Sequence, residues 1–368
     1  MTVHTGHPHY PSGQIAAGHR NRILRREEDN GVRVLRSLVY PAENRGFARR
    51  VLDHTALAAS AIATCPASGE VDLVIAESPP LFTAAAGVLY SALKRAALIL
   101  NISDLWPESA IELGALSSPP AIAASDGLAR YCYRHAAAIT TPTQTIVRRL
   151  TEIPQAAGKV HHVPPAVDLD RFSGLDRISP SSERPLRVLY AGTIGIAQSL
   201  HTLIEAAAIA GPRVLDLRIA GEGPELPRLK RMVHERGLGN VRLLGPVAAE
   251  GVPALYGEVD AGVVCLRDLA LFQGALPSKL FEVLAAGRAV ILSARGEAAE
   301  VIERHGAGVA VAPENPRALA EAFMSLSSDP VLTMEVASRA RAAAALYSRE
   351  AAVERWWSII SEIAGRRS

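Results

Sequence analysis

Short apolar runs that alternate with longer helical segments constrain the fold of this chain more than any other feature. In the first half of the chain the runs are VRVL (33–36), DLVIA (72–76), ALILNI (97–102) and AAIT (137–140). Helical patterns cover residues 48–63 and 81–93 between them. Alternation of buried strands with helices predicts parallel β/α units.

A polar stretch that contains prolines, DRISPSSERP (176–185), interrupts this pattern and predicts a linker. The alternation then restarts, and the runs are LRVLYAG (186–192), LDLRIAG (215–221), VRLLG (241–245), AGVVCL (261–266), AVILSA (289–294) and AGVAVA (307–312). We therefore predict two doubly wound α/β domains, residues 1–168 and 186–347, joined by a linker at 169–185. An amphipathic helix is expected in the last segment, 348–368.

Composition limits the class of protein. The formal charge of +2 on 368 residues gives no case for general nucleic-acid binding. The three cysteines, Cys65, Cys132 and Cys265, are far apart, which suits a reducing compartment and argues against a disulfide framework or a cysteine zinc site. No apolar run reaches the roughly 18 residues of a membrane span. Because charged and polar residues also begin at once, we expect a cytoplasmic protein.

Two glycine-containing loops follow strands of the second predicted domain. Gly192 and Gly195 follow the first of these strands, and Gly221 and Gly223 follow the next. Glycine lets a backbone approach a phosphate closely, and a helix that follows supplies free N–H donors. Ligands of such sheets bind at the carboxyl ends of strands, so the loops predict a site for a phosphorylated ligand.

The stretch LPSKLFEVLAAG (276–287) predicts a short helix with Pro277 in its first turn and Gly287 just past its end. Lys279 is unexpected there, because the helix dipole disfavours a cation in the first turn. A bound anion at this helix start would explain it. The alternative is that Lys279 and Glu282 form an exposed pair on one helix face.

Several blocks of the chain resemble the family 4 glycosyltransferases. They are TGHPHYPSG (5–13), ESPPLFTAAAG (77–87), SDLWPESAIELGAL (103–116), VDLDRF (167–172), AGTIGIAQSLHTLIEAA (191–207), AGEGPE (220–225) and LPSKLFEVLAAGRAVILSARGEAAEVI (276–302). The resemblance implies the GT-B fold, in which two Rossmann-like domains face a cleft and the C-terminal helix crosses back to the first domain. The DLWPES and LPSKLFE blocks are similar to the branch that builds bacterial surface polysaccharides, which includes N-acetyl-fucosamine transferases.

The resemblance assigns roles by position and also exposes departures. Glu282 matches the glutamate that grips the ribose hydroxyls, whereas the other motif glutamate falls at Gly274. The arginine and lysine that contact the pyrophosphate fall at Thr193 and Gln198. Lys279 and Arg267 are the obvious replacement cations, and the rival interpretation is a weakened or inactive enzyme.

In the first domain, the family histidine falls at Ser103, immediately before Asp104. We expect Asp104, Lys279 and Arg267 to be catalytic, although Asp104 could instead cap the following turn and Arg267 could lie in a solvated loop. Glu108 is expected near the substrate or as an ordinary first-turn charge. The full substrate-binding set is Gly192, Thr193, Gly195, Gln198, Gly221, Gly223, Pro246, Leu276, Pro277, Ser278, Glu282, Ser103 and Glu108.

The implied activity is retaining transfer of a sugar from a nucleotide-sugar to a glycan or lipid-linked acceptor in surface-polysaccharide synthesis, such as O-antigen or capsule. The donor is expected to be a UDP-linked, N-acetylated sugar, and no cofactor or metal is required. A UDP-sugar 2-epimerase of the same fold and an inactive nucleotide-sugar-binding protein remain alternatives.

Metal binding by His4, His7 and His9, or by Asp168 and Asp170, is disfavoured because these residues lie in blocks that the family uses without metal. A dehydrogenase is disfavoured as well, because the third glycine position of a dinucleotide fingerprint is Leu226.

The N-terminal region carries two further expectations. Its arginines would suit peripheral contact with an anionic membrane surface, and they are Arg20, Arg22, Arg25, Arg26, Arg45, Arg49 and Arg50. Residues 1–5 resemble the second strand of the family's first domain. The first domain is therefore expected to lack the family's first strand and glycine-rich loop.

Overall fold

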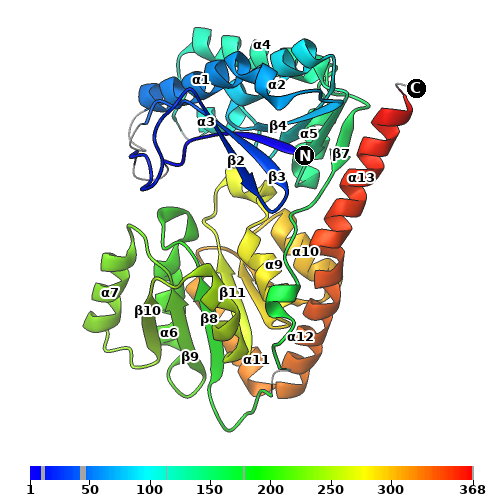
Figure 1. Cartoon of the computed structure of the whole chain (residues 1–368). Helices are drawn as coiled ribbons and strands as arrows, with labels where there is room; N and C mark the ends of the chain where they lie inside the picture. Colours follow the sequence, from blue (N-terminus) through cyan, green and yellow to red (C-terminus); the bar gives the residue numbers. More distant parts are fainter. Residues whose placement is uncertain (10–12, 42–46, 113, 177–178, 367–368) are drawn as a thin grey trace. The chain divides into compact units, whose positions relative to one another are not determined.

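The computed structural model describes residues 1–9, 13–41, 47–112, 114–176 and 179–366 (Figure 1). The chain divides into two compact units. The first comprises Met1–Val163 together with Ser358–Ser368, and the second comprises Pro164–Trp357. Helix α13 (Arg349–Gly365) therefore begins in the second unit and ends in the first.

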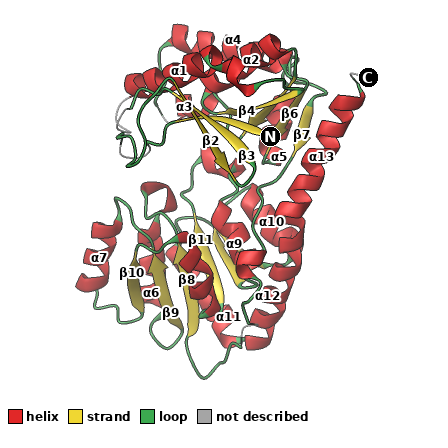
Figure 2. Cartoon of the chain, viewed as in Figure 1, coloured by secondary structure: helices red, strands yellow, loops and turns green. Residues whose placement is uncertain are grey.

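The second unit is built on a six-stranded parallel sheet with the order β10-β9-β8-β11-β12-β13 (Figure 2). Its strands are β8 (Leu186–Ala191), β9 (Leu215–Ala220), β10 (Val241–Gly245), β11 (Ala261–Cys265), β12 (Ala289–Ser293) and β13 (Gly308–Val311). Its helices are α6 (Leu200–Ala210), α7 (Leu226–Glu235), α8 (Val252–Gly257), α9 (Ser278–Ala285), α10 (Glu297–His305), α11 (Pro316–Ser328) and α12 (Pro330–Ala344).

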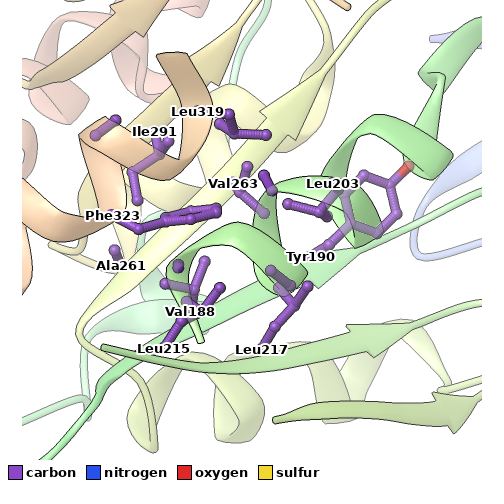
Figure 3. Packing of buried hydrophobic residues seen from close by; sticks show 14 of the residues in the cluster. Val188, Tyr190, Leu203, Leu215, Leu217, Ala261, Val263, Ile291, Leu319 and Phe323 are labelled. Atoms are coloured by element: carbon purple, nitrogen blue, oxygen red, sulfur yellow. The ribbon is translucent and has the colours of Figure 1, made fainter. Parts of the chain in front are cut away.

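Successive residues at the end of β8, from Val188 to Ala191, enter two different cores, which explains why this part of the strand is apolar throughout. Val188 and Tyr190 pack with α6 and α11 in one cluster (Figure 3). Leu189 and Ala191 point to the other face, where α9 and α10 pack. Side chains of a strand alternate between faces, so burial of both faces requires a continuous apolar run.

The first unit contains a four-stranded parallel sheet with the order β4-β5-β6-β7. Its strands are β4 (Leu73–Ser78), β5 (Ala97–Ile102), β6 (Ala138–Thr141) and β7 (Val160–His162). The helices of the unit are α1 (Phe47–Ala63), α2 (Leu81–Lys94), α3 (Glu108–Glu112), α4 (Pro119–His135) and α5 (Gln144–Thr151). Leu98, Leu100 and Ile139 are buried in one core with residues of α2 and α4.

A separate three-stranded sheet precedes it, with the order β1-β3-β2. Strand β1 (Thr2–Gly6) is parallel to β3 (Val32–Ser37), and β2 (Leu24–Asp29) is antiparallel to β3. Among the described strands, β1 and β4 are both edge strands. The expectation that this domain lacks the family's first strand and glycine-rich loop stays a prediction.

Each of the ten apolar runs coincides with a strand, so those predictions are confirmed. Strands β2 and β7 were not predicted from the sequence. Strand β2 has the charged sequence LRREED, yet the Asn30-Gly31 turn with positive φ values of 48° and 79° is a strong hairpin signal. One boundary was wrong: α9 begins at Ser278, so Pro277 precedes the helix instead of lying in its first turn. In the described part of the chain, no helix is both long and apolar enough to cross a bilayer.

Candidate active site

The two glycine loops of the second unit pack backbone against backbone. A Cβ atom at Gly221 would lie 1.8 Å from the Gly192 carbonyl oxygen, and one at Gly223 would lie 2.3 Å from that of Ile194. The Ile194 N–H donates to the Glu222 carbonyl at 2.8 Å. Gly221 and Gly223 are therefore required for contact between the loops. Their predicted role in close approach to a phosphate stays a prediction.

A cavity of about 270 Å³ lies at the carboxyl ends of β8 and β9. Five predicted site residues line it, namely Gly192, Thr193, Gly221, Pro246 and Glu282. The sequence analysis missed its other lining residues, which are Ala191, Ala220, Glu222, Val247 and Val252. Most of these are neighbours of predicted residues, so extending each loop by one position would have found them.

Lys279 lies directly beneath the first loop. A Cβ atom at Gly192 would be 2.9 Å from the Lys279 Cε atom, so a larger residue there would displace the lysine. The Lys279 Nζ donates to the Tyr190 hydroxyl at 3.1 Å and lies 4.9 Å from the centroid of that ring. The Tyr190 hydroxyl in turn donates to the Thr193 carbonyl at 2.6 Å. The cation is thus fixed against the loop.

The electrostatics of Lys279 are those of a cation that lacks a matched anion. Within the described residues, no carboxylate forms an ion pair with Lys279. Burial lowers the pKa of its ammonium, and the negative charge of Glu282 only partly opposes that shift. A buried cation is costly unless it is paired. An anionic ligand at Gly192 would supply the missing partner.

Glu282 lies three residues after Lys279 on α9 and forms part of the cavity wall. It is half-buried, and burial raises the pKa of its carboxyl group, whereas the positive charges of Arg171 and Lys279 oppose the rise. A carboxylate in this position can accept hydrogen bonds from two hydroxyl groups of a ligand.

Other predicted residues of this unit do not line the cavity but shape the first loop and the start of α9. The Gln198 Oε1 atom accepts a hydrogen bond from the Gly195 N–H at 3.1 Å and so closes a 3-10 turn over Ile196–Gln198. Pro277 accepts the first helical hydrogen bond of α9 from Leu280 at 3.0 Å. Leu276 packs against the adjacent core, and Ser278 is exposed at the helix start.

Arg267 lies away from this cavity in the described structure. Its Nε atom is 3.6 Å from the Glu314 Oε1 atom, and its side chain lines another hollow, with Asp268 and Arg295. Its backbone N–H donates to the Ala197 carbonyl at 3.0 Å, which ties it to the first loop. The structure therefore brings Lys279 and Glu282 together but not Arg267, whose phosphate role stays a prediction.

The predicted residues of the first unit follow β5. Ser103 is exposed, and its hydroxyl donates to the Glu77 carboxylate, a partner that the sequence analysis missed. Asp104 is half-buried directly after it. Glu108 begins α3, and its Oε2 atom is buried without a hydrogen-bond partner among the described residues.

The N-terminal histidines have separate partners. The ring of His4 forms a hydrogen bond with Ser37, that of His7 with the Arg22 carbonyl and that of His9 with Asp53. Asp168 pairs with Arg349 at 2.8 Å. In the described part of the chain, no three metal-ligating side chains are grouped together.

The arginines of the N-terminal region are only partly available to a membrane. Arg25 pairs with Glu27 at 2.7 Å, whereas Arg20, Arg22 and Arg26 are exposed. Arg49 is exposed as well. Arg45 and the Arg50 side chain lie outside the described residues.

Comparison with known proteins identifies the family of the chain. Residues 174–345 match the family described as "Glycosyl transferases group 1", and residues 2–166 match the "Glycosyl transferase 4-like domain". The two matches together span nearly the whole chain. The protein is therefore a transferase, and the chain belongs to the family 4 glycosyltransferases, which have the GT-B fold.

Individual relatives are more distant. The chain is 26% identical over 335 residues to WcaI of Escherichia coli, named as a colanic acid biosynthesis glycosyl transferase, with 87% of this chain and 82% of WcaI covered. It is 27% identical over 266 residues to the alpha-D-kanosaminyltransferase of Streptomyces kanamyceticus, with 65% of each covered.

Two solved structures share the fold. Anabaena HepE, solved with UDP and glucose, has a TM-score of 0.65 and 19% identity, with 84% of this chain and 81% of HepE covered. The sucrose-phosphate synthase of Thermosynechococcus elongatus has a TM-score of 0.72 and 17% identity, with 99% of this chain and 89% of that chain covered.

Proposed function

We propose that this protein is a retaining glycosyltransferase that moves a sugar from a UDP-linked, N-acetylated donor to a glycan or lipid-linked acceptor in surface-polysaccharide synthesis. The observation that carries the proposal is that Glu282 lines the cavity, while Lys279 lies against Gly192, which lines the same cavity. Lys279 offers a partly buried cation beneath the loop of Gly192, and Glu282 offers a carboxylate three residues further along the same helix. Both groups suit a diphosphate with an attached ribose, because the cation can pair with the diphosphate and the carboxylate can accept hydrogen bonds from the ribose hydroxyls.

In this proposal the diphosphate lies against Gly192 and Thr193, above the Lys279 ammonium. The nucleoside lies along Glu282 toward Pro246 and Val247, which complete the cavity. The acceptor oxygen bonds to the anomeric carbon as the bond from that carbon to the diphosphate breaks. The acceptor proton passes to the departing diphosphate, on whose face the attack occurs. Lys279 then stabilises charge that grows on the leaving group, which is where binding energy accelerates a reaction.

Arg267 is proposed as the second cation that acts on the leaving group, as its attachment to the Ala197 carbonyl suggests. Reaching the diphosphate would require its side chain to leave Glu314. Asp104 and Glu108 are proposed to act on the acceptor side. The proposed location is the cytoplasm, with peripheral contact of the exposed arginines with the anionic inner face of the membrane. The chemistry requires no metal or other cofactor.

A thermal-shift screen with UDP, GDP and their sugars tests the donor assignment. The true donor should raise the melting temperature through mass action, and UDP alone should do so to a smaller extent. If no UDP compound changes the melting temperature at concentrations well above the usual millimolar range of weak ligands, the proposal is wrong.

Two readouts separate the alternatives. A 2-epimerase would convert the UDP-sugar into its epimer without any acceptor, and nuclear magnetic resonance of the sugar would show the new anomeric signal. A binding protein would show the thermal shift but no release of UDP with any acceptor. Transfer to an acceptor with retention of the anomeric configuration would exclude both.

A further inference from the structure

Three polar side chains form one row across the carboxyl ends of β4, β5 and β6. Glu77 is in register with Asn101, and Asn101 is in register with Thr140. The residues directly before them on the three strands, Ala76, Leu100 and Ile139, are buried and apolar. The row therefore interrupts an apolar sheet at the edge where parallel sheets bind ligands.

The row is linked by directed hydrogen bonds. The Thr140 hydroxyl donates to the Asn101 Oδ1 atom at 2.8 Å, which turns the amide nitrogen toward the next strand. The Asn101 Nδ2 atom then donates to the Glu77 Oε2 atom at 2.7 Å. The Ser103 hydroxyl, from the segment that follows β5, donates to Glu77 Oε1. Both carboxylate oxygens are thus held in a fixed orientation.

Packing alone does not account for this arrangement. Thr140 is completely buried and Asn101 half-buried, so apolar residues at both positions would avoid the cost of desolvating polar groups. The carboxylate that they orient is nevertheless exposed. Each of its oxygens can accept further hydrogen bonds beyond the one it already receives. The chain therefore presents a fixed carboxylate to solvent.

We propose that Glu77 binds hydroxyl groups of the acceptor, with Asn101 and Ser103 as positioning residues. The ligand class is a sugar with two adjacent hydroxyl groups, because a carboxylate held at both oxygens can accept from both hydroxyls at once. Ser103 occupies the position where the family resemblance places a histidine. We therefore assign the polar contact with the acceptor at this edge of the sheet to Glu77. This inference rests on the proposed function, because it assigns the acceptor side of the same reaction.

The test uses the full-length protein saturated with UDP and a simple probe, methyl β-D-glucopyranoside, with methyl N-acetyl-β-D-glucosaminide as a second probe. Saturation-transfer magnetic resonance measures binding of the probe. We expect Glu77→Gln and Ser103→Ala each to raise the dissociation constant of a probe at least fivefold, without any change in UDP affinity. Glu70→Gln is the matched control, because it removes one exposed carboxylate from the same unit and should leave probe binding unchanged.

The proposal is overturned if Glu77→Gln binds the probes like the unmodified protein, or if the unmodified protein binds neither probe. It is also overturned if Glu70→Gln weakens binding as much as Glu77→Gln, since general charge would then explain the effect. Failure of UDP to bind the unmodified protein would instead remove the proposed function itself, so the two failures can be told apart.

Discussion

The Lys279 ammonium lies 3.1 Å from the Tyr190 hydroxyl and 4.9 Å from the centre of the same ring. Because that hydroxyl also donates to the Thr193 carbonyl, Tyr190 connects the cation to the loop above it. The aromatic face attracts the cation without neutralising it. Tyr190 therefore holds the ammonium group of Lys279 next to the loop without supplying a negative charge. A bound anion could supply that charge.

Replacement of Lys279 by methionine should weaken UDP binding by about 2 kcal/mol, or about 30-fold, because one charge-assisted contact to phosphate is lost. Methionine keeps much of the side-chain volume. The variant should fold at least as stably as the unmodified protein, since a partly buried cation near a helix start is removed. Isothermal titration with UDP and urea unfolding measure the two quantities.

The control is Lys230→Met, which removes an exposed lysine from α7 of the same unit and should change neither quantity. The pH dependence gives a second check. Burial lowers the pKa of Lys279, so UDP affinity should fall as the pH rises through that lowered pKa. The methionine variant should lack this alkaline loss. Equal affinity of the variant and the unmodified protein would show that Lys279 does not contact phosphate.

Glu282→Gln should weaken every ligand that carries ribose, including free UDP, because a neutral amide accepts hydroxyl hydrogen bonds less strongly than a carboxylate. Burial raises the pKa of Glu282, so its ionised form is already disfavoured in the folded protein, and the free energy of unfolding should rise or stay constant in the variant. In the unmodified protein, UDP affinity should fall as the pH drops through that raised pKa.

Titration with UDP and with inorganic diphosphate tests the assignment. The glutamine variant should lose affinity for UDP but keep its affinity for diphosphate, which has no ribose. Glu321→Gln, an exposed position on α11, serves as the control. An unchanged UDP affinity would remove the ribose role.

Strands that are buried on both faces were predictable, because they carry continuous apolar runs, as in 97–100 and 289–292. The unusual place of Lys279 was visible in the sequence for the opposite reason, because a cation does not suit the first turn of a helix. The link from Asn101 to Glu77 was not predictable, since it depends on the register between two strands. The contact between Gly221 and Gly192 was not predictable either, because nothing in the local sequence shows that a second backbone lies against Gly221.

The contact between the glycine loops gives a stability prediction with an internal control. Gly221→Ala would place a methyl group 1.8 Å from the Gly192 carbonyl oxygen, where neither backbone can move freely. Gly237 also has a positive φ, of 60°, but a Cβ atom there meets nothing within 4 Å. Gly237→Ala should therefore cost only about 1 kcal/mol of backbone strain, whereas Gly221→Ala should cost about 3 kcal/mol or more. Urea unfolding measures both, and equal costs would contradict the loop–loop contact.

Asp260, the residue directly before β11 in the second unit, is completely buried, and two arginines contact its carboxylate. Its carboxylate accepts from Arg184 Nη1 at 2.6 Å and from Arg187 Nη2 at 3.0 Å. Burial alone would raise its pKa, but these hydrogen bonds outweigh burial and lower the pKa to about 2. Asp260→Asn should therefore destabilise the protein by about 3 kcal/mol near neutral pH, since two guanidinium groups lose their anion.

A carboxyl group with a lowered pKa stabilises the folded state above its unfolded pKa of 3.8 and loses that contribution as the pH falls toward about 2. The difference in unfolding free energy between Asp260→Asn and the unmodified protein should accordingly shrink by up to about 2 kcal/mol over this acid range. Urea unfolding at a series of pH values measures it, with the exposed Glu235→Gln as the control. A difference that stays constant down to the lowest pH at which the protein folds would show that the ionised form of Asp260 is not what the arginines stabilise.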